Sequence, residues 1–165
     1  MKKIVAILAI ALLFIGCSGD DKELQNVEAK LVVGKSLSNL KLNNQNEQPQ
    51  SLSPETKILF FSFAKKTGHM CNEFLESKSA DFLAKHNALY IADVSAAPGI
   101  IKSMFILPDL KELPFQILLI NDDRLSAEYS KAMDKESIVV VHLENGTITK
   151  IENLHSKEDL ESLFK

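Results

Sequence analysis

The sequence predicts an α/β domain in which helices cover both faces of a mixed central sheet. Dense apolar runs that are typical of buried strands recur along the chain. Stretches with helical apolar spacing stand between these runs. Near the end, Glu144-Asn145-Gly146 separates two extended runs and predicts a β-hairpin, which adds antiparallel strands. This order favours a three-layer α/β/α sandwich.

The first half of the predicted domain contains two strands and a helix. Closely spaced leucines indicate a short entry strand, and an uninterrupted apolar run indicates a strand that is buried on both faces. Apolar residues at near-helical spacing then indicate a helix, with a break where two serines flank a lysine. In order, these are a strand near residues 37–42, a polar turn at 43–49, a strand at 57–63 and a helix at 68–86, broken near 77–79.

A second buried strand, Ala88 to Val94, leads into another predicted helix. Ser95 is a suitable cap, and Pro98 suits the first turn. We expect Pro108 to end this helix, because proline lacks the backbone N–H that a helix interior needs. The residues expected on its buried face are Ile100, Ile101, Met104 and Phe105.

The C-terminal part supplies a third buried strand, a short helix, the hairpin and a last helix. Ser156, followed by acidic residues at 158 and 159, has the spacing of a capping box for the last helix. Leu160, Leu163 and Phe164 are expected to face inward from it. The other predicted elements are the strand 113–120, a turn at Asp122-Asp123, the helix 125–133 and the hairpin strands 137–143 and 147–151.

The amino terminus has the pattern of an export signal. Lys2 and Lys3 precede an apolar run from Ile4 to Ile15, and Gly16-Cys17 follows. The run is too short for a transmembrane helix, which needs about 20 apolar residues. A plain signal peptide with a chance cysteine is the alternative interpretation.

The segment Phe14-Ile15-Gly16-Cys17 resembles the lipobox of bacterial lipoproteins, although Phe14 replaces the usual leucine-like residue. The resemblance implies cleavage before Cys17 and attachment of several acyl chains there, palmitate among them. More than one chain is needed for stable anchoring. We therefore predict a signal peptide at 1–16, a lipidated tether at 17–33 and a domain at 34–165.

Composition narrows the function further. The whole chain has 19 basic and 22 acidic residues, and the leader removes Lys2 and Lys3 from the basic ones. No basic stripe remains for phosphates, so we predict no nucleic-acid partner. The predicted partners are a membrane, through the lipid, and an envelope protein. The expected location is the cell envelope, at the inner or outer membrane, with the domain in the periplasm.

From Gly34 to Phe164 the arrangement resembles the thioredoxin-like fold in its peroxiredoxin-type form. Ile58 to Phe63 looks like the central strand of this family, which delivers the active-site loop at the start of a helix. Residues 113–122 and 127–129 resemble the family's next strand and short helix, and 139–148 resemble its closing hairpin. The proline that faces a thioredoxin active site would fall near Ser137, so Pro114 is interpreted as a strand-entry residue.

The active-site loop departs from both family motifs. Thioredoxins have Cys-x-x-Cys there, but Gly68 stands where a pair with Cys71 would place its first cysteine. Peroxiredoxins have a threonine three residues before the cysteine. Here that position is again Gly68, Thr67 is one residue early, and Ala64 takes the place of the family's proline.

Cys71 and His69 are the candidate reactive residues. Near a helix start, free N–H groups and the helix dipole would favour the Cys71 thiolate, with His69 and Lys65 or Lys66 lowering its pKa further. Alternatively, Cys71 is a small apolar residue on a buried helix face. Two ligands are too few for structural zinc, so we predict no metal and no cofactor.

These observations lead to one main hypothesis and one alternative. The main hypothesis is a membrane-anchored envelope lipoprotein whose thioredoxin-like domain is non-catalytic and binds a protein or a small ligand. The alternative is a thiol-dependent peroxidase or oxidoreductase that uses the single Cys71.

Overall fold

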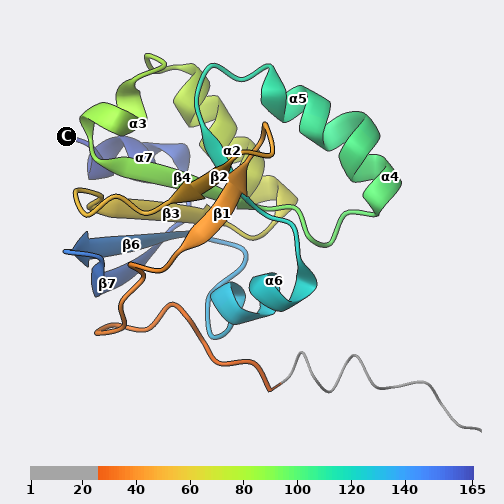
Figure 1. Ribbon diagram of the computed structural model, residues 1–165. Helices are drawn as coiled ribbons and strands as arrows, with labels where there is room; N and C mark the ends of the chain where they lie inside the picture. The colour runs from red at the N-terminus through yellow and green to blue at the C-terminus, as the bar shows by residue number, and fades with distance from the viewer. Residues whose placement is uncertain (1–25) are drawn as a thin grey trace, which may run out of the picture.

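The computed structural model describes residues 26–165, and a seven-stranded mixed sheet runs through this part (Figure 1). The leader and Cys17 lie outside the described residues. The strand order is β2-β1-β5-β4-β3-β6-β7. The strands are β1 (Lys41–Asn44), β2 (Pro49–Ser51), β3 (Ile58–Ser62), β4 (Ala88–Asp93), β5 (Ile117–Ile120), β6 (Ile138–Glu144) and β7 (Thr147–Leu154).

The centre of the sheet is parallel and its outer strands are antiparallel. β3 pairs with β4 and β4 with β5 in parallel, whereas β6 runs antiparallel to β3. The apolar runs predicted these central strands, because both of their faces are covered. Asn145 and Gly146 have φ values of 49° and 76°, the left-handed geometry that a tight hairpin needs. The predicted hairpin is therefore confirmed.

Helices and the N-terminal segment form the two outer layers. One core, around Phe60 and Tyr90, includes buried residues of α2, α3, α5 and α7. The other, around Phe61 and Ile91, includes Tyr129 of α6, which lies below the sheet in Figure 1. The predicted sandwich is confirmed. The helices are α2 (Lys65–Glu76), α3 (Phe82–Lys85), α4 (Gly99–Ile101), the π-helical η1 (Lys102–Ile106), α5 (Leu107–Lys111), α6 (Asp123–Ser130) and α7 (Lys157–Leu163).

The helix after the central strand starts earlier than the sequence predicted. α2 begins at Lys65 instead of Gly68, because the Thr67 hydroxyl bonds the backbone of Ala64 and starts the first turn. The predicted break is confirmed, since α2 ends at Glu76 and α3 begins at Phe82.

The prediction for the helix after β4 was wrong in three respects. The helix begins at Gly99 with Pro98 at its N-cap, so Ser95 does not cap it. Ile100, Ile101, Met104 and Phe105, which were expected to be buried, are all exposed. Pro108 does not end the helix either, because it stands in the first turn of α5, directly after η1. The π turn of η1 adds a residue to one helical repeat, so the predicted stripe and the residues that follow it fall on different sides of the helix. The residues that pack on the core are instead Ile106, Leu107 and Leu110.

The packed part of the chain begins before residue 34. Leu31 is buried in the core beside α6, and the Lys30 N–H donates to the Glu128 carbonyl at 3.0 Å. The Lys30 ammonium also lies 2.9 Å from the Glu128 carboxylate. These residues belong to the segment that was predicted as tether, and the structure places them on the domain.

The last helix agrees with its sequence pattern. Ser156 caps α7 in a capping box with Asp159, and Leu160 is buried. Leu163 and Phe164 pack against the same core. None of the helices in residues 26–165 has the length and apolar character to span a bilayer.

Candidate functional site

The edge at the carboxyl ends of β3 and β4 is where the predicted active-site loop lies. The chain leaves β3 at Ser62 and enters α2 at Lys65. Thr67, in the first turn, is fully buried, and its hydroxyl donates to the Ala64 carbonyl at 2.8 Å while accepting from the Ala64 N–H at 3.2 Å. The threonine thus stabilises the helix start, and its hydroxyl is not presented to solvent.

Cys71 does not lie at the start of a helix, so that part of the sequence prediction was wrong. It is the seventh residue of α2 and its exposed fraction is 0%. There the orphan N–H groups of the first turn are no longer adjacent, and their effect on the thiolate is lost. Burial raises the pKa of the Cys71 thiol far above its ordinary value, and a hydrogen bond with Tyr90 opposes this only in part. The thiol is therefore protonated at neutral pH.

His69 is not brought to Cys71 by the fold. Two residues along an α-helix turn a side chain by about 200°, so the two side chains point to opposite sides of α2. His69 is exposed, whereas Cys71 is buried. Lys65 and Lys66 are also exposed, on the first turn of the helix. The group of residues that was expected to lower the Cys71 pKa is thus dispersed.

The Cys71 thiol belongs instead to a buried polar cluster beneath α2. The hydroxyls of Ser62 and Tyr90 lie 2.9 Å apart, and both residues are at most 2% exposed. A Cβ on Gly68 would lie 3.7 Å from the Ser62 hydroxyl and 3.9 Å from the Tyr90 hydroxyl. Burial raises the pKa of Tyr90 as well. These hydrogen bonds satisfy polar groups within the core.

Neither Ser62 nor Tyr90 was predicted to belong to the site. The parallel register pairs Phe60 with Tyr90, so Ser62 and Tyr90 lie on one face of neighbouring strands, two positions apart. Ser62 ends the first apolar run and Tyr90 lies in the middle of the second, so a hydroxyl in each run was the only available signal. It becomes informative only when the pairing of the two strands is known.

Other polar residues at this edge also have structural partners. Asp93, at the end of β4, accepts hydrogen bonds from the Ser95 N–H at 2.9 Å and from the Ser126 hydroxyl. Ser137, just before β6, is fully buried and donates to the Asp134 carbonyl at 2.9 Å. Pro114 lies three residues before β5, at the opposite edge of the sheet, where this parallel strand begins. In residues 26–165, no three His, Cys, Asp or Glu side chains gather as a metal site would require.

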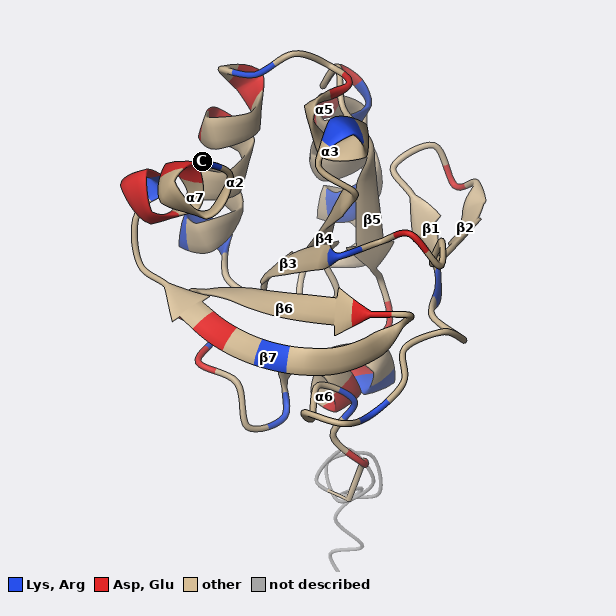
Figure 2. Cartoon of the chain, turned by 90° about the vertical axis from the view of Figure 1, so that its left-hand side faces the viewer, with Lys and Arg blue, Asp and Glu red and all other residues tan. Residues whose placement is uncertain are grey.

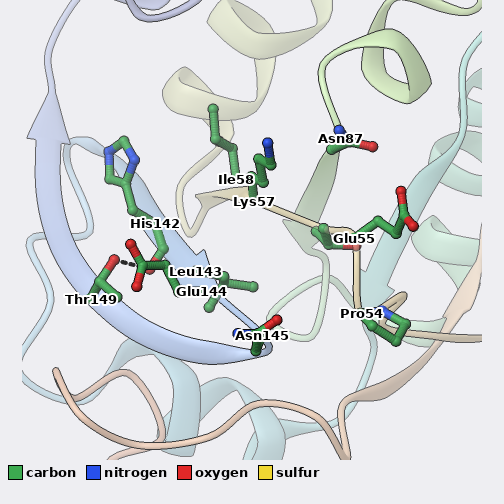
Figure 3. Close-up of a pocket in the computed structure, with 11 residues that line it drawn as sticks. Pro54, Glu55, Lys57, Ile58, Asn87, His142, Leu143, Glu144, Asn145 and Thr149 are labelled. Atoms are coloured by element: carbon green, nitrogen blue, oxygen red, sulfur yellow. Dashed lines mark hydrogen bonds between the residues drawn. The ribbon is translucent and has the colours of Figure 1, made fainter.

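An open hollow lies at the opposite edge of the sheet, where β3 and β4 begin and β6 ends (Figure 3). Its volume is about 860 Å³. The His142 Nε2 lies 2.5 Å from the Glu152 carboxylate, which also accepts from the Lys150 ammonium at 2.7 Å. The lining comes from three separate segments, which is why the sequence did not predict it: residues 54–58, Asn87, and residues 142–145 with Thr149.

Comparisons with known proteins give the fold. No protein-family model matches the chain, and no curated protein matches it. A cysteine-to-serine variant of peroxiredoxin Q from Xanthomonas campestris is 12% identical with a TM-score of 0.53, over 84% of this chain and 96% of that one. A Bacteroides thetaiotaomicron protein assigned as a disulfide isomerase is 16% identical with a TM-score of 0.51, over 84% and 89% of the two chains.

A peroxidoxin of Mycobacterium tuberculosis is similar to the same degree, with 14% identity, a TM-score of 0.51 and coverage of 80% and 92%. The fold is therefore thioredoxin-like, as the sequence predicted. At these identities the likeness concerns the fold alone.

Proposed function

We propose that this chain is an envelope lipoprotein, anchored through Cys17, whose thioredoxin-like domain acts by binding and not by thiol chemistry. Anchoring is argued from the leader pattern and the lipobox. The binding role is argued from one observation, the position of Cys71. A reactive cysteine needs exposure and a stabilised thiolate. Cys71 is 0% exposed, and burial favours its protonated form.

The hollow at the far edge supports binding of a small ligand. Its size is in the range of small-molecule sites. Lys57, His142 and Glu144 line it, so polar groups of both charge signs meet apolar surface there. Asn87 and Thr149 add groups that form hydrogen bonds. A small molecule with both polar and apolar parts would suit this lining.

The thiol part of the proposal is tested by the reactivity of Cys71 in the intact lipoprotein. If Cys17 carries lipid, Cys71 is the one free thiol of the chain. We expect a disulfide reagent to modify Cys71 at a negligible rate in the native protein and completely in denaturant. Peroxide should form sulfenic acid at Cys71 no faster than it does on a free cysteine. Cys71→Ala is the blank for both measurements.

The alternative is a thiol-dependent peroxidase or oxidoreductase. It requires α2 to open so that the Cys71 sulfur meets solvent and loses its proton. In that case the native thiol would react with peroxide much faster than free cysteine, giving a sulfenate at Cys71 and releasing the alcohol or water. That result would overturn the binding proposal.

Anchoring is tested separately with Cys17→Ser. The wild-type chain should incorporate labelled fatty acid, lose its leader and partition with membranes. The variant should do none of these if Cys17 carries the lipid. Unchanged labelling, size and partitioning in the variant would refute the lipoprotein assignment.

A further inference from the structure

The helix built from α4, η1 and α5 has an exposed apolar face. Its exposed fractions are 67% for Ile100, 42% for Ile101, 61% for Met104 and 56% for Phe105. We call these four residues the apolar face. They follow helical spacing, so they lie together, while Leu110 and its neighbours hold the other side of the helix to the core. Contiguous exposed apolar surface of this kind marks an interaction site.

Charge is low along the segment that carries the apolar face, and the exposed Asp109, four positions after Phe105, marks its edge. Between Val94 and Pro108 the one charged residue is Lys102, and its ammonium donates to the Asn121 carbonyl at 3.2 Å. This contact directs the lysine toward the end of β5. Contact with an apolar medium along this segment would therefore require little desolvation of charge.

Helix α6 lies between the place where the chain enters the domain and the region of α4 (Figure 1). The Lys131 ammonium, at the end of α6, donates to the Val27 carbonyl at 2.6 Å. At its other end, α6 follows Asn121, which Lys102 contacts. The eight residues of α6 span about 12 Å, and the side chains of Lys131 and Lys102 add to the separation between the entering chain and α4.

The length of chain beyond the described part sets how far the domain can be from a lipid on Cys17. Residue 26 is nine positions after Cys17. At no more than about 3.5 Å per residue, the reach is about 30 Å. A bilayer that holds the lipid is thus within reach of the apolar face.

We propose that the apolar face docks on the surface of the bilayer that holds the Cys17 lipid, an inference that rests on the proposed anchoring. A convex apolar helix inserts at the headgroup boundary without the shape complementarity that a protein partner requires. Four side chains bind weakly from bulk solution, but the tether makes their contact intramolecular and raises the effective concentration of the surface. The lipid and the apolar face together would fix the orientation of the domain.

The experiment uses the full lipidated chain in phosphatidylcholine vesicles with a single tryptophan as reporter. The chain has no tryptophan, so Phe105→Trp introduces the only indole. We expect blue-shifted emission and strong quenching by lipids that are brominated in their acyl chains. Glu158→Trp, on exposed α7 at the other side of the molecule in Figure 1, is the matched control and should show neither effect.

The outcomes separate this inference from the anchoring itself. If the Phe105→Trp protein floats with the vesicles but its indole emits as in water, the docking inference is wrong and the anchor stands. Blue-shifted emission without bromolipid quenching means that a second copy or another protein covers the face, which also overturns docking. If the protein does not float, the anchor fails and docking fails with it.

A second variant tests whether the quenching depends on the apolar face. Met104→Glu, added to Phe105→Trp, places a charge on the apolar face at an exposed position, so folding should be unaffected. Bromolipid quenching should then fall to the level of the Glu158→Trp control. Quenching that survives Met104→Glu would contradict insertion of this face.

Discussion

Two helical regions flank the parallel strands, and one buries its apolar residues while the other exposes them. In α2, the exposed fraction is at most 1% for Phe74, Leu75 and Cys71. The helix from Gly99 to Lys111 exposes Ile100, Met104 and Phe105 by more than half of their surface. Both regions have apolar residues at helical spacing.

The difference teaches that an apolar stripe predicts a helix but not what covers the stripe. The Phe74 ring meets the rings of Phe82 and Phe164 at centroid distances of 5.6 and 5.9 Å. These partners come from α3 and from the residue after α7, so the burial of α2 depends on distant parts of the chain. The exposed stripe has no such partner in the described part, and a membrane is the partner that we propose for it.

The largest predicted effect is on stability, and it compares a buried phenylalanine of α2 with an exposed one of the other helix. Phe74→Ala should lower the free energy of unfolding by about 3–5 kcal/mol, because it leaves a cavity in the core. Phe105→Ala is the matched variant and should change stability by no more than about 0.5 kcal/mol, as exposed substitutions do. Urea unfolding of both variants measures this. Equal losses would mean that Phe105 is buried in the native protein.

A smaller loss is expected from the polar cluster beneath α2. Tyr90→Phe removes the partner of the Ser62 hydroxyl at 2.9 Å and leaves a buried group unsatisfied, at a cost of about 1–3 kcal/mol. Tyr129→Phe is the control, since it leaves the Ser62 hydrogen bond in place. Urea midpoints and the reactivity of Cys71 should be measured together. Faster modification of Cys71 in Tyr90→Phe, at unchanged stability, would show that the cluster shields the thiol and adds little energy.

The smallest effect is expected at the edge of the hollow and depends on pH. Hydrogen bonds from Lys150 and His142 hold the pKa of Glu152 below its ordinary value. A lowered folded-state pKa contributes stability that is fully present above the unfolded value of about 4.3, and that is lost as the pH falls through the folded value. For this partly exposed pair we expect about 0–1 kcal/mol.

Glu152→Gln tests this contribution directly. The variant should lose the small stability difference at neutral pH and show a flatter stability profile below pH of about 4. Glu144→Gln, on the neighbouring strand β6, is the control for the loss of one negative charge (Figure 2). If Glu152→Gln and the wild type lost stability in the same way as the pH falls, the interaction of Glu152 with Lys150 and His142 would not contribute to stability.

Much of the fold was predictable because its signals are local. The apolar run at 57–63, the Asn145-Gly146 turn and the Ser156 cap each depend on neighbouring residues, and each prediction is confirmed. The candidate site was less predictable. Cys71 and His69 are two positions apart in the sequence, yet a helix directs them to opposite sides. The hollow gathers residues from segments far apart in the chain, and no local pattern marks them.

The sequence by itself determined the order of the central strands and the helices, the hairpin and the cap of the last helix, because these follow from backbone preferences and apolar spacing over a few residues. It did not determine the short strand β2, which lies where no strand was predicted. Tertiary structure alone decided which helix face is covered and where the Cys71 sulfur lies. The π turn at Lys102–Ile106 separates one apolar stripe from the residues that pack on the core, and Tyr90, whose hydroxyl bonds Ser62, is the hydrogen-bond partner of the buried thiol. The first outcome depends on a change of helical repeat that no apolar pattern marks. The second depends on contacts between residues from separate segments, where desolvation and packing outweigh local propensity.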